Sequence, residues 1–119
     1  MAYDNNNVFA KILRGEIPAK KIYEDEYALA FPDLNPQAPV HVLVIPKGAY
    51  RNFPEFVANA TQAEIAGFFK AVASVAKQLG HEDEGYRILS NIGKNGGQEV
   101  PHLHIHIFAG GKLGAMIGK

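Results

Sequence analysis

The segment Pro101–Phe108, PHLHIHIF, decides the predicted fold because it has the pattern of a strand with two different faces. It contains three of the chain's five histidines, which alternate with apolar residues: His102, Leu103, His104, Ile105, His106 and Ile107. Successive side chains of a strand point to opposite faces, so we expect three imidazoles on one face and aliphatic side chains on the other. The aliphatic face would pack on a core. The imidazole face would line a cleft, because a buried polar group without a partner costs about 1–3 kcal/mol.

The composition indicates one globular domain spanning residues 1–119. With 119 residues and 47% hydrophobic composition, the chain can bury a core. Its 12 basic and 12 acidic residues cancel, so it lacks the positive charge with which proteins bind nucleic acids. Cysteine is absent, which excludes disulfides and thiolate metal ligands. The sequence shows no signal peptide and no apolar run near ~18 residues, so we expect no membrane association and a cytoplasmic protein.

Apolar periodicity and turn residues predict an α+β fold with a mainly antiparallel five-stranded sheet, one long helix and a short N-terminal helix. The short helix begins after Asn6 or Asn7 and ends at Gly15. The predicted strands are residues 21–24, 27–31, 41–46, 86–93 and 101–109. A glycine-rich segment, 93–99, is predicted to be the loop that joins the last two strands.

The clearest helix is predicted over residues 61–79. Thr61 and Glu64 match a capping box, apolar residues recur every three or four positions, and Gly80 follows as a stop signal. Gly67 lies inside this helix and costs about 1 kcal/mol relative to alanine. It therefore marks either a close packing contact or a tolerated defect.

Three interpretations of the histidine strand compete. It could be a solvated face with no function. It could bind a metal, although the backbones of His102 and His106 would be ~13 Å apart at ~3.3 Å per residue, so one ion could not easily reach all three rings. Two of them together with His41 could still ligate zinc.

The third interpretation is phosphate chemistry. An imidazole with a pKa of ~6.5 keeps a free nitrogen at neutral pH and can act as a nucleophile without a separate base. Crowded rings would titrate as a coupled set, with one neutral and others cationic beside a bound phosphate. The preceding glycines Gly93, Gly96 and Gly97 would let backbone N–H groups approach that phosphate.

The residues described so far resemble the histidine triad (HIT) family, whose signature is His-x-His-x-His followed by apolar residues, here 102–108. The resemblance extends over most of the chain. Three blocks match, in order and spacing, the nucleotide-binding branch of that family: VFAKILRGEIPAK (8–20), AFPDLNPQAPVHVLVIPK (30–47) and NGGQEVPHLHIHIFAGG (95–111).

The resemblance implies a role for each matching residue. His104 would be the nucleophile that forms a covalent nucleotidyl-imidazole, flanked by His102 and His106, with His41 completing the set. Asn91 and Gly97 would contact the phosphate region, and Asp33 would accept the ribose hydroxyls, as a carboxylate can. The implied apolar wall around the base consists of Phe9, Ile12, Ile17, Phe31 and Leu34.

The chain departs from the family pattern at three places. Glu99 stands where many members carry a serine that can contact the leaving nitrogen; its charge could repel phosphate or act in proton transfer. Asn7 and Ala10 stand where some relatives have paired cysteines, so we infer no structural zinc. The tail lacks the tryptophan of some relatives, so the preference for a leaving group does not carry over.

The function implied by the resemblance is that of a purine nucleoside phosphoramidase, acting as a homodimer with no metal and no cofactor. Such an enzyme cleaves the P–N bond of adenosine or guanosine 5′-phosphoramidates and releases the purine nucleotide. The alternatives are a dinucleoside polyphosphate hydrolase or nucleotidyltransferase of the same superfamily, a non-catalytic nucleotide-binding regulator, and a metal-binding protein.

Overall fold

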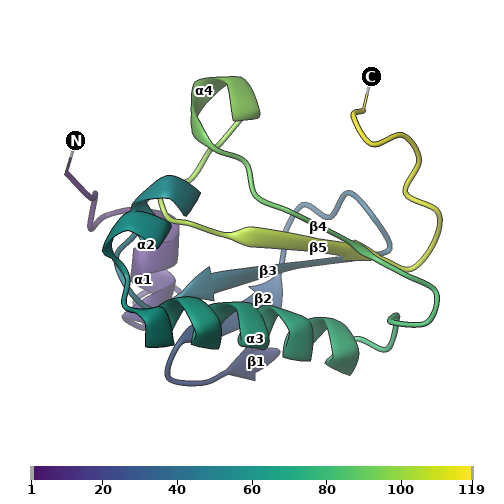
Figure 1. Ribbon diagram of the computed structural model, residues 1–119, viewed down its shortest axis with the longest axis horizontal. Helices are drawn as coiled ribbons and strands as arrows, with labels where there is room; N and C mark the ends of the chain where they lie inside the picture. The colour runs from purple at the N-terminus through teal and green to yellow at the C-terminus, as the bar shows by residue number, and fades with distance from the viewer. Residues whose placement is uncertain (1, 119) are drawn as a thin grey trace.

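The computed structural model describes residues 2–118 and contains a five-stranded sheet in the order β1-β2-β3-β5-β4 (Figure 1). Every neighbouring pair of strands is antiparallel. The strands are β1 (Tyr23–Glu24), β2 (Ala28–Pro32), β3 (Val40–Pro46), β4 (Arg87–Leu89) and β5 (Ile105–Ala109). The helices are α1 (Val8–Leu13), α2 (Phe53–Asn59), α3 (Gln62–Gln78) and α4 (Gly93–Gly96). The predicted α+β fold with an antiparallel sheet is confirmed.

The two faces of the sheet pack on different helices (Figure 1). Small residues of β2, Ala28 and Ala30, face α3 and are fully buried against its apolar stripe. The alternating residues Leu29 and Phe31 face the other way and pack with Phe9 of α1. This alternation follows from the two-residue period of a strand, and it leaves the α1 face of the sheet for the functional site.

The helices begin and end largely where the sequence predicts. The Asn7 side chain accepts a hydrogen bond from the Ala10 N–H and caps α1. Thr61 and Glu64 form the predicted capping box of α3. Gly80 follows α3 with a φ of 83°, which glycine adopts without steric cost. Among the described residues, no helix is both long and apolar enough to cross a membrane.

Gly67 marks a close packing contact. A Cβ atom at this position would lie 2.2–2.6 Å from ring atoms of Tyr27, far inside van der Waals distance. The aromatic ring of the β1–β2 turn therefore packs directly on the helix backbone. Of the two explanations that the sequence left open, the structure supports the packing contact.

The prediction that residues 101–109 form one strand is wrong for its first half. β5 begins at Ile105, so His106 is the only triad histidine inside a strand. The His102 N–H bonds to the Val100 carbonyl and the Leu103 N–H to the Tyr50 carbonyl, instead of to a sheet ladder. The three imidazoles therefore do not share one face of a strand.

Three further elements, β4, α4 and α2, differ from the prediction. β4 covers only Arg87–Leu89 of the predicted strand 86–93, because the chain then turns into α4. α4 is a single helical turn within the predicted loop 93–99, and α2 was not predicted at all. α2 has the local signals of a helix, with Asn52 as its cap and Pro54 in the first turn.

Candidate active site

A cavity of about 630 Å³ lies on the α1 face of the sheet. It brings together residues of α1, β2, β3, β5 and the segment around α4. Eleven of the predicted site residues line it: Phe9, Ile12, Ile17, Phe31, Asp33, Leu34, Asn91, Gly97, Glu99, His104 and His106. Two predicted site residues, His41 and His102, do not line it.

One part of the cavity is apolar. Phe9 and Phe31 are buried and meet edge to face, with ring centroids 5.6 Å apart. Ile12 and Leu43 belong to the same hydrophobic cluster. Leu34 also lines the cavity but is fully exposed at its rim. These side chains form an apolar surface that can bury a planar ring.

His104 presents one ring nitrogen to the cavity. Its Nδ1 atom lies 2.7 Å from the backbone carbonyl of His102. A carbonyl only accepts, so Nδ1 carries the proton and Nε2 holds the free lone pair. The Ser90 hydroxyl donates to the His104 carbonyl at 2.9 Å and holds the backbone of the same residue. The Phe9 ring lies against the imidazole, with centroids 4.9 Å apart.

His102 lies behind His104, outside the cavity lining, and is completely buried. Its Nε2 atom lies 2.9 Å from the Pro46 carbonyl and therefore donates. Its Nδ1 atom lies 2.6 Å from the Tyr3 hydroxyl. Both ring nitrogens are thus paired within the protein, which corrects the expectation of a cleft-facing ring. The sequence could not show this because both partners are remote along the chain.

Gln37, His41 and His106 are linked by hydrogen bonds, and the contacts of each ring determine which atom donates. The backbone N–H of Gln37 donates to His41 Nδ1 at 3.1 Å, so His41 Nε2 carries the proton of the neutral ring. That Nε2 lies 2.9 Å from His106 Nδ1 and donates to it. The proton of His106 is therefore on Nε2, which is buried and has no hydrogen-bond partner among the described residues. A buried N–H without a partner is costly, so this atom is a donor suited to an incoming ligand.

Burial favours the neutral form of all four rings. It lowers the pKa of His102 to about 4, and the pKa of His106 to about 4 with help from the neighbouring His104 and His41. Burial also lowers the pKa of His41, against the opposing charge of Asp33. It lowers the pKa of His104, although the His102 carbonyl, Asp33 and Glu99 act in the opposite direction. The free ring nitrogen of His104 is therefore unprotonated at neutral pH.

Asp33 lies between the apolar part of the cavity and the histidines. One carboxylate oxygen accepts from the Asn35 N–H at 2.8 Å, and the other lies 3.5 Å from His41 Nε2. Asp33, His41 and His106 each offer one ligand atom within 4.8 Å of the others, a spacing that could hold a metal ion. However, His41 Nε2 and His106 Nδ1 already bond to each other, so a metal there would have to displace that bond.

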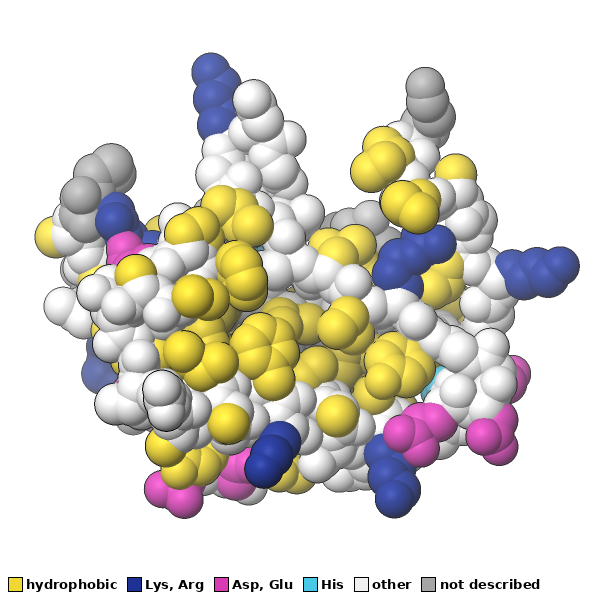
Figure 2. Space-filling model, viewed as in Figure 1, with side chains coloured by type: hydrophobic (Ala, Val, Ile, Leu, Met, Phe, Trp, Pro, Cys, Tyr) yellow, Lys and Arg dark blue, Asp and Glu magenta, His cyan; other side chains and the backbone are white. Residues whose placement is uncertain are grey.

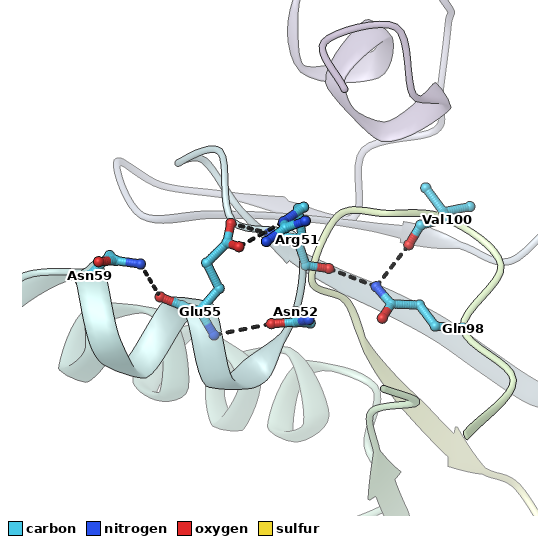
Figure 3. Close-up of polar contacts among 6 residues, drawn as sticks. All are labelled: Arg51, Asn52, Glu55, Asn59, Gln98 and Val100. Carbon is cyan, nitrogen blue, oxygen red and sulfur yellow. Dashed lines mark hydrogen bonds and ion pairs between the residues drawn. The ribbon is translucent and has the colours of Figure 1, made fainter. Parts of the chain in front are cut away.

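The glycine-rich segment before the triad is held by Gln98 (Figure 3). Its side-chain amide donates to the carbonyls of Arg51 and Val100, and its carbonyl accepts from the Gly93 N–H. Gly97 has a φ of 77°, a left-handed conformation that favours glycine. These contacts tie the cavity wall formed by Asn91, Gly97 and Glu99 to the start of α2.

Sequence reasoning missed three residues that organise this site. They are Tyr3, which contacts His102; Gln37, whose N–H sets the His41 tautomer; and Ser90, which holds the His104 carbonyl. Gln37 lies inside a block that matches the family, and no other feature of the sequence pointed to its role. Tyr3 and Ser90 contact residues that are 99 and 14 positions away in the sequence, and no local sequence pattern marks either of them.

Comparison with known proteins gives relatives along nearly the full chain. An uncharacterized HIT-like protein of Azospirillum brasilense is 66% identical over 117 residues, covering 98% of this chain and 96% of the relative. A purine nucleoside phosphoramidase of Escherichia coli is 39% identical over 110 residues, covering 92% of each chain.

Solved structures give the same result. A histidine triad protein from Clostridium difficile superposes with a TM-score of 0.86 at 40% identity, covering 98% of this chain and 100% of that one. A HIT family hydrolase from Legionella pneumophila gives a TM-score of 0.87 at 37% identity, covering 95% and 100%. The model of the HIT domain family matches residues 14–113. This chain therefore belongs to the HIT family.

Proposed function

We propose that this HIT-family protein is a purine nucleoside phosphoramidase that hydrolyses the P–N bond of adenosine or guanosine 5′-phosphoramidates. The observation that carries the proposal is the pair of ring nitrogens at the cavity. His104 Nε2 has a free lone pair, and His106 Nε2–H is a buried donor that no residue in the described part of the chain (2–118) accepts from. A nucleophile beside an unpaired donor suits attack on a phosphorus whose oxygens need hydrogen bonds. The phosphoramidase relative from E. coli supports this choice of reaction.

The reaction would proceed in two displacements. The lone pair of His104 Nε2 attacks phosphorus, the P–N bond breaks, and the amine leaves after its nitrogen takes up a proton. We assign that proton transfer to the protonated carboxyl group of Glu99 in the cavity lining, which becomes a carboxylate. Water then attacks the same phosphorus and gives a proton to the Glu99 carboxylate, the bond to His104 breaks, and the nucleoside monophosphate leaves with the oxygen of that water. His106 Nε2–H would donate to a phosphate oxygen in both steps.

The remaining lining residues would bind the nucleoside. The apolar surface around Phe9 and Phe31 can bury a purine ring. Asp33 is positioned to accept hydrogen bonds from the ribose hydroxyls, and Asn91 and the Gly97 backbone to contact phosphate. No step requires a metal or cofactor.

Acid-quenched mass spectrometry tests the proposal. During turnover of an adenosine 5′-phosphoramidate, we expect a nucleotidyl adduct on His104. His104→Ala should remove the adduct and lower kcat by at least about a thousandfold. His81→Ala is the matched control, because His81 lies outside the cavity lining and pairs with Glu84. Absence of the adduct would point to a nucleotide-binding protein without catalysis, and faster turnover of a diadenosine polyphosphate would point to the other hydrolase branch.

We also propose a homodimer joined through β4. This strand lies at the edge of the sheet, where its backbone groups are free to pair with a second sheet. Figure 2 shows a hydrophobic patch over α3 and β4 on this face, and exposed apolar side chains there include Phe69 and Ile88, 37% and 47% exposed. Ile88→Lys should yield a monomer in sedimentation equilibrium, whereas Ile88→Val should not. A monomeric parent protein would refute the proposal.

The cytoplasmic location predicted from the sequence also remains a proposal. Cell fractionation of the native host tests it, and recovery of the protein in a membrane or secreted fraction would contradict it.

A further inference from the structure

The N-terminal segment reaches the histidine cluster through Tyr3. Its hydroxyl lies 2.6 Å from His102 Nδ1, and the two rings meet edge to face with centroids 5.7 Å apart. Tyr3 does not line the cavity, and the proposed reaction does not use it. Its contact is nevertheless with a fully buried histidine next to the nucleophile.

The direction of this hydrogen bond follows from the other contacts of the ring. His102 Nε2 faces the Pro46 carbonyl, which only accepts, so that nitrogen carries a proton. The pKa of His102 is lowered to about 4 by burial, so the ring holds one proton at neutral pH. Nδ1 is therefore the acceptor, and the Tyr3 hydroxyl donates to it.

Tyr3 is tied to α1 by the turn that follows it. The backbone and side-chain N–H groups of Asn7 both bond to the Asp4 carbonyl, at 3.2 and 2.7 Å. Asn7 is buried and also caps α1 by accepting from the Ala10 N–H. This turn fixes the segment that carries Tyr3 relative to the helix that lines the cavity.

His102 is thus held from two sides, by Tyr3 at one ring nitrogen and by the end of β3 at the other. Its backbone carbonyl accepts the proton of His104 Nδ1 at 2.7 Å. We propose that Tyr3 is a positioning residue for His104: by donating to His102 Nδ1 it holds the ring that is bound to Pro46 and so fixes the carbonyl that orients the nucleophile. This inference rests on the proposed role of His104.

Loss of the Tyr3 hydroxyl would leave a buried nitrogen of His102 without a donor. The Pro46 carbonyl would still hold the proton on Nε2, so the ring would gain from shifting until another donor, such as water, reaches Nδ1. A shift of the ring moves the His102 carbonyl and rotates His104. Attack on phosphorus is sensitive to such a displacement, whereas nucleotide binding depends on other residues.

The test compares Tyr3→Phe with Tyr23→Phe. In the control, Tyr23 of β1 loses the hydroxyl that donates to Asp25, and neither residue lines the cavity. We expect kcat for an adenosine phosphoramidate to fall about tenfold in Tyr3→Phe with KM within about twofold, and neither to change in Tyr23→Phe. In ¹⁵N NMR of the histidine rings, His102 should show only the Nε2–H tautomer in both proteins, and its Nδ1 resonance should shift in Tyr3→Phe because the hydroxyl donor is lost.

Either of two results would overturn the inference: unchanged kcat in a folded Tyr3→Phe, or a His102 tautomer in the parent protein other than Nε2–H. The second measurement needs no variant, so it decides the matter even if Tyr3→Phe does not fold. It also needs no substrate. If NMR confirms the Nε2–H tautomer of His102 but the protein does not hydrolyse the phosphoramidate, the proposed function is wrong while the assigned hydrogen bond stands.

Discussion

His41 Nε2 lies 2.9 Å from His106 Nδ1, and this contact sets which nitrogen of His106 faces the cavity. The Gln37 N–H occupies the other nitrogen of His41, so the proton between the two rings belongs to His41. His106 consequently keeps its own proton on Nε2. His41, whose side chain is only 1% exposed, thus determines which ring nitrogen of the cavity residue His106 carries the proton.

Replacing His41 by alanine should therefore impair catalysis without removing a cavity residue. His106 Nδ1 would lose its donor, and the ring would populate the tautomer with no proton on Nε2. Removal of one preorganised donor costs about 10²–10³ in kcat, and we expect at least a tenfold loss from this indirect effect. Steady-state kinetics and ¹⁵N NMR of His106 measure the two effects. An unchanged His106 tautomer would contradict the explanation.

Glu99→Gln should slow the release of basic amines. If Glu99 supplies the proton to the leaving nitrogen, kcat should fall strongly for an alkylamine phosphoramidate and little for a nitroaniline phosphoramidate, which leaves without full protonation. The two substrates serve as controls for each other, and an equal loss on both would assign Glu99 a binding role.

The same variant should shift the pH profile. Burial lowers the pKa of His104 below its usual 6.5, and the charge of Glu99 opposes this shift. Removing that charge should move the acid limb of kcat/KM to lower pH, because protonated His104 has no lone pair for attack. A shift of the acid limb to higher pH would contradict this effect of the Glu99 charge on His104.

Acid should destabilise the fold through its buried histidines. The pKa values of His102 and His106 fall from 6.5 to about 4 on folding, so the unfolded chain binds more protons within this interval. Their contribution to the free energy of unfolding is complete above about pH 6.5 and decreases as the pH falls toward 4, by about 1.4 kcal/mol per unit of pKa difference. Urea unfolding at several pH values measures it. His102→Asn should flatten the curve, and a parent curve that is already flat would contradict burial of neutral rings.

Gly67→Ala should destabilise the protein although alanine favours helix by about 1 kcal/mol. The new methyl group would overlap the Tyr27 ring, and overpacking of this kind costs about 1–3 kcal/mol. In a Tyr27→Ala background the overlap is absent, so the same change should raise the free energy of unfolding. Thermal or urea unfolding of the four proteins measures this, and a destabilising effect in both backgrounds would contradict the packing explanation.

Dialysis against a chelator should leave phosphoramidase activity unchanged. Asp33, His41 and His106 have the spacing of metal ligands, but the proposed reaction uses the two rings as a hydrogen-bonded pair. Loss of activity on chelation, with recovery on addition of zinc, would instead show that this cluster binds a catalytic metal.

Local patterns predicted the elements that depend on neighbouring residues. The capping box of α3, the cap of α1 and the β1–β2 hairpin all rest on contacts within a few positions. The prediction of a strand over residues 101–109 was wrong at its N-terminal end. The alternation of polar and apolar side chains does not show where the backbone leaves the sheet. His102 and Leu103 direct their N–H groups to Val100 and Tyr50, and only the folded chain brings the Tyr50 carbonyl within reach.

The sequence by itself determined the chemistry of this protein: which residue types are present, their spacing, and through the family resemblance that His104 is the candidate nucleophile. Only the tertiary structure decided what each ring does. His102 proved to be a buried support, His41 sets a tautomer, and His106 offers a free donor, because their partners Tyr3, Pro46 and Gln37 come from other parts of the chain. The proton on an imidazole is placed by the acceptor or donor that folding brings to it, and a linear pattern does not contain that information.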